Sequence, residues 1–286
     1  MNKGRKDKKI AVITGASRGI GYATVELLSL HGFKIYACVR SLKSCKNLQN
    51  LADQNSNIEI LDLDLRNKSS IERVAKEIRK NEDKIDVIIN NAGAIIFGPI
   101  ETVGPEQFHE QFQVNLFGPI LLTQELIPLM RKEKKGHIIF LGSTSGIKSH
   151  GMYGAYAASK FALEAIAHSL AVNLHPWNIH VSIIELSATN TQFENKVIKL
   201  GSRVKDSDNP YLTYTKNSLR FLQMLIMNGA LPLEIAEAIL KVILKPPNEL
   251  RYFATKKSKD IFENSLKDPA NIDWQQEVVE SSNFYS

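Results

Sequence analysis

The chain has 286 residues, enough for one large α/β domain or two small ones. Apolar residues make up 43% of it and charged residues 23%, a composition typical of a globular protein and unlike collagen or a disordered chain. The formal net charge is +6, but five basic residues against one aspartate in the first nine positions leave only +2 for the rest. A nearly neutral body argues against nucleic-acid binding, which needs a basic face on the folded domain.

The N-terminal segment is basic, and we expect residues 1–8 to form a flexible tail. The apolar run that follows is too short for a signal peptide, and no run is long enough to cross a membrane, which predicts a cytoplasmic location. Cys38 and Cys45 predict reduced thiols, and the scattered histidines show no metal-ligand spacing, so we expect no metal site.

Short β-branched segments alternate with amphipathic ones along the chain. This pattern indicates a doubly wound parallel sheet with helices on both faces. Strands are expected at Ile10–Thr14, Lys34–Val39, Ile58–Asp62, Val87–Asn90, His137–Leu141, His180–Glu185 and Leu250–Ala254. Helices are expected near Gly19–Leu30, Ser69–Lys80, Pro105–Arg131, Tyr153–Leu174, Ser218–Asn228 and Leu233–Leu244. We therefore predict one α/β domain over residues 9–255 and a C-terminal extension over residues 256–286.

Residues 186–230 break this alternation, because no strand is expected among them. The segment follows the carboxyl end of a strand, where open α/β sheets bind ligands, so we predict a substrate-binding lid. Its run from Leu219 to Met227 is apolar nearly all round. Such a helix can cover an apolar substrate, contact another subunit or a membrane surface, or simply belong to the core.

A glycine-rich turn, Thr14 to Gly21, joins the first strand to the first helix. Its glycines allow a tight turn and let a pyrophosphate approach the helix N-terminus. An ordinary strand-to-helix turn that binds no ligand could have a similar sequence. The second strand ends at Arg40, where an NAD enzyme commonly has an acidic residue for the ribose hydroxyl. Arg40, together with Arg18 in the turn, suits a 2′-phosphate and favours NADP(H) over NAD(H), although either arginine could be a solvated surface charge.

Tyr156 and Lys160 are four residues apart, so on a helix they share one face and can serve one site. A nearby ammonium would favour the phenolate of the tyrosine, which makes Tyr156 a candidate proton-transfer group. Ser143 follows an apolar strand and can hydrogen-bond a substrate oxygen, or can be a turn serine. Asn115 lies among apolar residues in a helix, which indicates a specific hydrogen-bonding role or a satisfied core amide.

These motifs, in this order and spacing, resemble the short-chain dehydrogenase/reductase family over about residues 9–244. The resemblance implies a Rossmann-type fold and a hydride transfer between a nicotinamide cofactor and a carbonyl or alcohol carbon. It implies that Tyr156 is the acid/base, that Lys160 lowers the tyrosine pKa and binds ribose, that Ser143 stabilises the substrate oxygen, and that Asn115 holds a water. The implied cofactor contacts are Gly15, Ser17, Arg18, Gly19, Ile20, Gly21, Arg40, Asp64, Leu65, Asn91, Ala92, Gly93, Tyr156, Lys160, Thr189 and Thr191.

The chain departs from the family pattern after the sixth strand, where Leu186 and Ser187 stand in place of the usual proline and glycine turn. A different turn must therefore bring Thr189 and Thr191 to the cofactor. The resemblance is greatest to 17β-hydroxysteroid and retinol dehydrogenase-like members. Family resemblance implies a homodimer or homotetramer. The apolar segment over residues 186–230 predicts a bulky apolar carbonyl or alcohol substrate, with contact to a membrane surface or another subunit as alternatives. A cofactor-binding sensor or scaffold without turnover is the alternative function.

Overall fold

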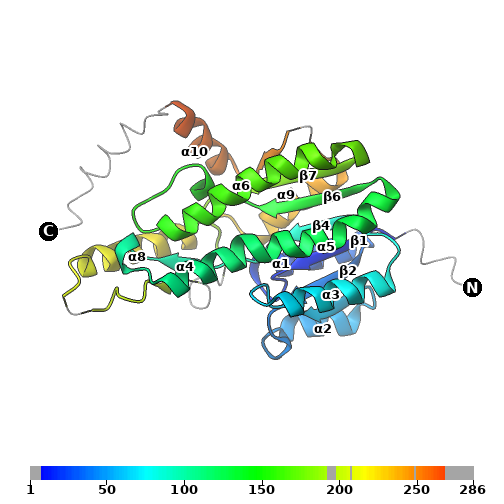
Figure 1. The fold of residues 1–286 in the computed structure, drawn as a ribbon, viewed down its shortest axis with the longest axis horizontal. Helices are drawn as coiled ribbons and strands as arrows, with labels where there is room; N and C mark the ends of the chain where they lie inside the picture. The colour runs from blue at the N-terminus through cyan, green and yellow to red at the C-terminus, as the bar shows by residue number, and fades with distance from the viewer. Residues whose placement is uncertain (1–7, 192–197, 207, 248, 268–286) are drawn as a thin grey trace, which may run out of the picture.

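The computed structural model describes residues 8–191, 198–206, 208–247 and 249–267. All but one residue of the predicted basic tail, and the end of the predicted C-terminal extension, lie outside these ranges. The main sheet has seven parallel strands in the order β3-β2-β1-β4-β6-β7-β9. Figure 1 shows β2, β1, β4, β6 and β7 side by side. They are β1 (Ile10–Thr14), β2 (Lys34–Val39), β3 (Ile58–Asp62), β4 (Val87–Asn90), β6 (Gly136–Leu141), β7 (Ile179–Glu185) and β9 (Arg251–Phe253). The predicted doubly wound α/β fold is confirmed.

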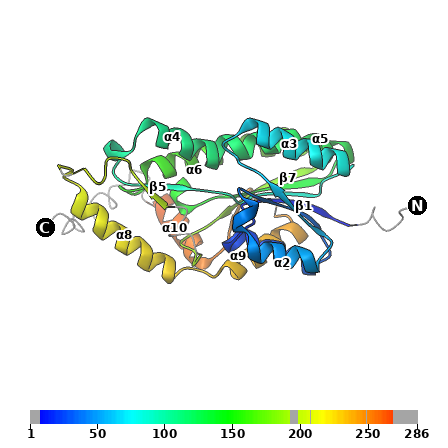
Figure 2. The same ribbon diagram turned by 90° about the horizontal axis from the view of Figure 1, so that it is seen from below.

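Helices cover both faces of the sheet, and alternate strand residues explain why (Figure 2). On β1, Val12 packs in the cluster that includes side chains of the helices on one face, whereas Ile13 packs in the cluster on the opposite face. One face is covered by α3 (Lys68–Asn81), α5 (Gly118–Glu133) and α6 (Gly154–Leu174), and the other by α1 (Gly19–Leu30), α2 (Lys46–Gln54) and α9 (Pro232–Leu244). Because both faces are covered, the strands are buried and read as continuous apolar runs.

The expected single helix over Pro105–Arg131 is interrupted. It consists of α4 (Pro105–Phe112), a π-helical turn (Gln113–Phe117) and α5, in which the Gly118 amide donates to the carbonyl of Gln113. Residues around the break are apolar at ordinary helical spacing, so periodicity alone could not reveal it. Such turns are rare and occur frequently at functional sites.

The expectation that residues 186–230 contain no strand is wrong. A three-residue strand, β8 (Ile198–Leu200), pairs in parallel with β5 (Ile95–Phe97) and forms a separate two-stranded sheet. Three residues are too few to produce a recognisable alternation, and the partner strand is distant in sequence. Helix α8 (Leu212–Met227), in the segment that we predicted to be a substrate-binding lid, begins six positions before the expected Ser218.

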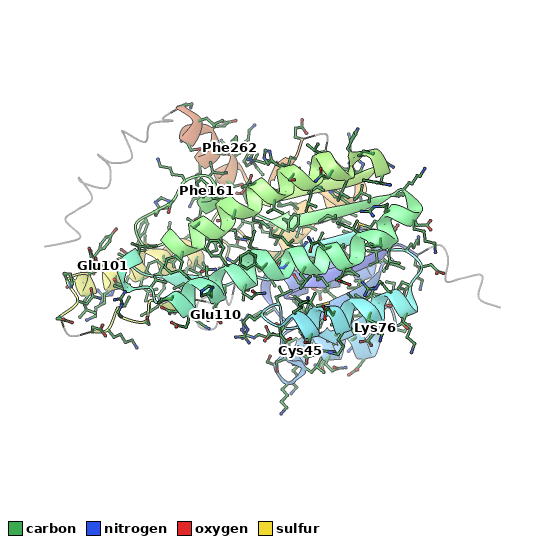
Figure 3. All side chains as sticks on the ribbon, in the orientation of Figure 1. Cys45, Lys76, Glu101, Glu110, Phe161 and Phe262 are labelled. Carbon is green, nitrogen blue, oxygen red and sulfur yellow. The ribbon has the colours of Figure 1, made fainter. Side chains whose placement is uncertain are left out.

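Helix α10 (Lys256–Lys267), in the region predicted only as an extension, packs beside β9. The ring of Phe262, labelled in Figure 3, lies 5.0 Å from that of Phe253, and the Arg251 guanidinium lies 5.6 Å from the Phe262 ring. Both cysteines are buried and unpaired. None of the helices in the described ranges is long and apolar enough to cross a membrane.

Candidate active site

A cavity of about 740 Å³ opens at the carboxyl ends of the parallel strands. It lies where β1 is flanked by β2 on one side and β4 on the other, the point at which the strand order reverses and ligands bind in such sheets. Every residue expected from the sequence to contact the cofactor or substrate lines this cavity except Gly21 and Asn115. One continuous space therefore connects the glycine-rich turn, the tyrosine and the lid.

The glycine-rich turn packs too closely against its neighbours to accept side chains. Gly15 has a φ of +68° and Gly19 a φ of +55°, values that favour glycine. A Cβ on Gly15 would lie 2.9 Å from Asn91 Nδ2, and one on Gly21 would lie 2.6 Å from the same atom. The Asn91 amide in turn donates to the carbonyl of Thr14 at 2.7 Å. Gly21 thus serves packing. The start of α1 has no side-chain cap, and Gly19 and Ile20 line the cavity, an arrangement that fits a bound pyrophosphate.

Arg18 and Arg40 both line the cavity beside this turn. Burial and the neighbouring Arg40 guanidinium lower the pKa of Arg18. Two cations that destabilise one another would each gain from an anion placed between or beside them. The pair is therefore suited to a doubly charged phosphate group.

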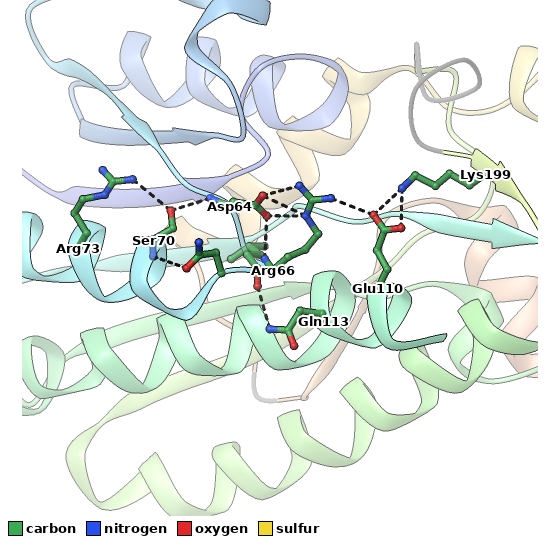
Figure 4. A network of polar contacts seen from close by, with 9 residues as sticks. Asp64, Arg66, Ser70, Arg73, Glu110, Gln113 and Lys199 are labelled. Atoms are coloured by element: carbon green, nitrogen blue, oxygen red, sulfur yellow. Dashed lines mark hydrogen bonds and ion pairs between the residues drawn. The ribbon is translucent and has the colours of Figure 1, made fainter. Parts of the chain in front are cut away.

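Asp64 belongs to a chain of ion pairs that reaches from the cofactor end of the cavity to the lid (Figure 4). Arg66 Nη2 lies 2.6 Å from Asp64 Oδ2 and Nη1 lies 3.3 Å from Glu110 Oε1. Glu110, on α4, also accepts from Lys199 of β8 at 2.6 Å. Hydrogen bonds from Arg66 and Lys199 hold the pKa values of Asp64 and Glu110, respectively, below their usual range. Sequence reasoning missed Arg66, Glu110 and Lys199, which lie far apart in the chain and carry no motif.

Tyr156, Ser143 and Lys160 meet where α6 passes the end of β6. Burial raises the pKa of Tyr156 to about 12, and a hydrogen bond with Ser143 opposes the shift. Lys160 Nζ lies 5.9 Å from the Tyr156 ring centroid and donates to the carbonyl of Leu141 at 2.7 Å. Burial lowers the pKa of Lys160 to about 8, against the charges of Glu185 and Glu164. Burial is therefore the main influence on the pKa of Tyr156, and the phenol keeps its proton at neutral pH.

Asn115 sits in the π-helical turn, buried behind the cavity wall. Its Oδ1 accepts from the Ala94 amide at 2.9 Å, and its Nδ2 donates to the Ala94 carbonyl and to Ser159 Oγ, both at 3.1 Å. The side chain thus connects the start of β5 to the helix that carries Tyr156. Of the two alternatives from the sequence, a buried amide with all its hydrogen bonds made is the one that fits the Asn115 side chain.

The segment after β7 reaches the site without a proline or glycine turn. Thr189 forms a bridge with Ala230, and the Asn190 amide donates to the Ala230 carbonyl at 2.8 Å. A Cβ on Gly229 would lie 2.8 Å from the Thr189 amide, so the glycine that allows this approach lies at the end of the lid instead. Thr191 packs on the glycine-rich turn, 3.2 Å from the position of a Gly19 Cβ.

The far end of the cavity is apolar. Its wall includes side chains of β5, of the loop before α6 and of α8: Phe97, Met152, Tyr153, Tyr214, Phe221, Leu222, Leu225 and Ile226. Leu222 and Ile226 are buried against the domain, whereas Met224 and Met227 face outward. Phe97, Met152 and Tyr153 lie outside the motifs and the lid, and sequence reasoning missed them.

The fold and this cavity define a nicotinamide-dependent oxidoreductase, and comparisons with known proteins agree. The family described as short chain dehydrogenase matches residues 9–199. Human 17-beta-hydroxysteroid dehydrogenase type 1 is 32% identical over 279 residues, covering 93% of this chain and 84% of that protein. A 3-ketodihydrosphingosine reductase from Bacteroides thetaiotaomicron is 31% identical over 242 residues, covering 84% and 86%. A short-chain dehydrogenase structure from Streptomyces avermitilis has a TM-score of 0.82 at 25% identity, covering 96% and 98%.

The chain therefore belongs to the short-chain dehydrogenase/reductase family. It is an NAD(P)-dependent oxidoreductase that acts on CH-OH groups.

Proposed function

We propose that the protein interconverts a bulky apolar ketone or aldehyde and the corresponding alcohol, with NADP(H) preferred over NAD(H). The observation that carries this proposal is the continuity of the cavity from Arg18 and Arg40, past Tyr156, to the apolar wall of β5 and α8. Arginine forms strong charge-assisted bonds with phosphate, and an apolar wall favours ligands that bury apolar surface against it.

The side chains at the centre of the cavity suit acid/base chemistry on a carbonyl oxygen. When bound, the nicotinamide supplies or accepts the hydride. Tyr156, protonated at neutral pH, gives its proton to the substrate oxygen in reduction, and Ser143 donates a hydrogen bond to the same oxygen. The Lys160 ammonium stabilises the negative charge left on the tyrosine and binds ribose. In alcohol oxidation the proton moves in the opposite direction. Asn115 connects α6 to the start of β5, and we propose that it holds the water that the family resemblance implies.

We further propose the cytoplasm as the location and a homodimer or homotetramer as the assembly. The outward faces of the π-helical turn and α6 support self-association, because Phe117 and Phe161 are 50% and 45% exposed there (Figure 3 labels Phe161). The exposed side chains of Met224 and Met227 on α8 could also contact a membrane surface. We favour turnover over a sensor or scaffold role because Tyr156 and Lys160 both line the cavity.

The test is a spectrophotometric screen of NADPH and NADH oxidation by the purified protein with steroid, retinoid and long-chain carbonyls beside a small polar ketone. The expected result is faster NADPH-dependent turnover of the apolar carbonyls. A clear preference for the small ketone would contradict the substrate class, and equal use of NADH would contradict the cofactor preference.

A further inference from the structure

Glu185, the last residue of β7, is an acid buried beside the reaction site that the mechanism above does not use. It has no exposed surface. Its carboxyl group lies against the backbone of Gly142, where a Cβ would come within 2.8 Å of Glu185 Oε2. Gly142 follows Leu141, whose carbonyl accepts the Lys160 ammonium, and precedes Ser143. The acid is therefore placed directly behind the strand end that carries the reacting groups.

No hydrogen-bond donor of the described residues reaches either carboxylate oxygen of Glu185. Arg251 of β9 faces it, with Nε 3.9 Å from Oε1. That guanidinium instead bonds Glu164 Oε2, at 2.9 Å from Nε and 2.6 Å from Nη2, and its Nη2 lies 3.1 Å from His168 Nε2. A buried carboxylate without donors is costly, so a proton on Glu185, which makes it a donor toward Glu164, resolves the conflict.

The charges around Glu185 agree with that assignment. Burial, then the hydrogen bond and charge of Glu164, raise the pKa of Glu185 far above its usual range, while Arg251 and Lys160 oppose the shift. These groups come from α6 and β9, and α6 also brings Tyr156 and, through Arg251, His168. The end of β6 next to Glu185 contributes only backbone and apolar side chains. The one titratable residue of β6, His137, lies near the opposite end of the strand.

We propose that Glu185 is a positioning residue: it shares a proton with Glu164 at neutral pH, and by releasing that proton at alkaline pH it holds Tyr156 and Lys160 in the protonated forms that carbonyl reduction needs. The inference rests on the proposed roles of Tyr156 and Lys160. It concerns the pH range over which those roles operate.

The sign of the effect is the same for both reacting groups. A negative charge on Glu185 raises the pKa of Tyr156 and the pKa of Lys160. Reduction needs a protonated tyrosine and a charged lysine, so the ionised Glu185 delays both losses as pH rises. Glu185→Gln is neutral at every pH and cannot provide this delay.

The experiment measures kcat/KM for NADPH-dependent reduction across pH in the wild type and in Glu185→Gln, each profile normalised to its own plateau. We expect the alkaline limb of Glu185→Gln to move to lower pH by about one unit, the size of shift that a neighbouring charge causes. Glu164→Gln is the matched control: it removes an equal charge that raises the pKa of Lys160 but not that of Tyr156, and it leaves Glu185 free to ionise, so its alkaline limb should move clearly less than that of Glu185→Gln. An unmoved limb in Glu185→Gln, or equal movement in both variants, would overturn the proposal.

Infrared spectroscopy of the wild-type protein provides a readout that depends neither on activity nor on the folding of a variant. A buried protonated carboxylic acid has its own carbonyl band, and we expect this band at neutral pH, with loss of it as the pH becomes alkaline. Glu185→Gln, if folded, should lack the band. If Tyr156→Phe retained activity, the proposed function would fail while the infrared result still stood. Absence of the band at neutral pH would refute the shared proton whatever the catalytic result.

Discussion

The two ends of the cavity are built on different principles. At the cofactor end, backbone determines the site: the glycine-rich turn is fixed by Thr14 and Asn91 and follows a fully buried strand. At the substrate end, side chains determine it, presented by the three-residue strands β5 and β8 and by α8, whose apolar residues are partly exposed. A backbone site tolerates few changes and suits a constant ligand, whereas a wall of side chains can be altered residue by residue.

The largest expected effect lies where the two ends meet. Tyr156→Phe removes only the proton-transfer hydroxyl, so kcat should fall by at least about a hundredfold, the lower range for a general acid/base. NADPH affinity, measured by fluorescence titration, should change little because the cofactor end is untouched. Retention of more than about a hundredth of the wild-type kcat would show that another group transfers the proton.

At the cofactor end, Arg40→Ala should weaken NADPH binding by roughly ten- to a hundredfold and leave NADH binding nearly unchanged, because one charge-assisted phosphate contact is lost. Lys43→Ala is the matched control, since it removes the same charge nearby from an exposed residue that does not line the cavity. Titration of both cofactors into the three proteins checks this. Equal losses of NADPH affinity in the two variants would show that Arg40 acts only through its charge and makes no direct phosphate contact.

At the substrate end, Phe221→Ala should lower kcat/KM for a bulky apolar carbonyl by about tenfold, equivalent to roughly 1.4 kcal/mol of lost apolar contact. The value for a small polar ketone should stay the same. Met224→Ala is the control, because Met224 is on the same helix with 51% of its surface exposed and does not line the cavity. If Phe221→Ala and Met224→Ala behaved alike, the lid would not contact the substrate through this residue.

The smallest effect is expected where ion pairs join the two ends. Glu110→Gln breaks its bonds to Arg66 and Lys199, yet these groups are partly exposed, so the free energy of unfolding should fall by only about 1 kcal/mol or less. Urea unfolding at low and high salt measures this, and the difference should shrink in high salt. A loss above about 2 kcal/mol would mean that the network couples the lid to the cofactor end far more strongly than surface ion pairs do.

Most of the sheet could be predicted from sequence because its central strands are buried on both faces and are bounded by turns, as at Ile10–Thr14 before Gly15. The motif residues could be placed at one site because parallel strands end at one edge. The strand at Ile198–Leu200 could not be predicted, since its partner is remote and its length gives no period. Glu185 could not be identified either, because a glutamate at a strand end looks solvated until Gly142 and Glu164 surround it.

The π-helical turn at Gln113–Phe117 amounts to one residue inserted into a continuous helix. Each residue of an α-helix advances the chain by about 100° of rotation and 1.5 Å, so this one residue sets the angular phase of everything from Gly118 to Glu133 relative to Pro105–Phe112. Deletion of a single position here would keep the composition and the helical propensity and yet turn the buried stripe of Leu122 and Leu126 away from the sheet. The length of this segment is therefore a structural constraint in its own right, separate from the identity of its residues.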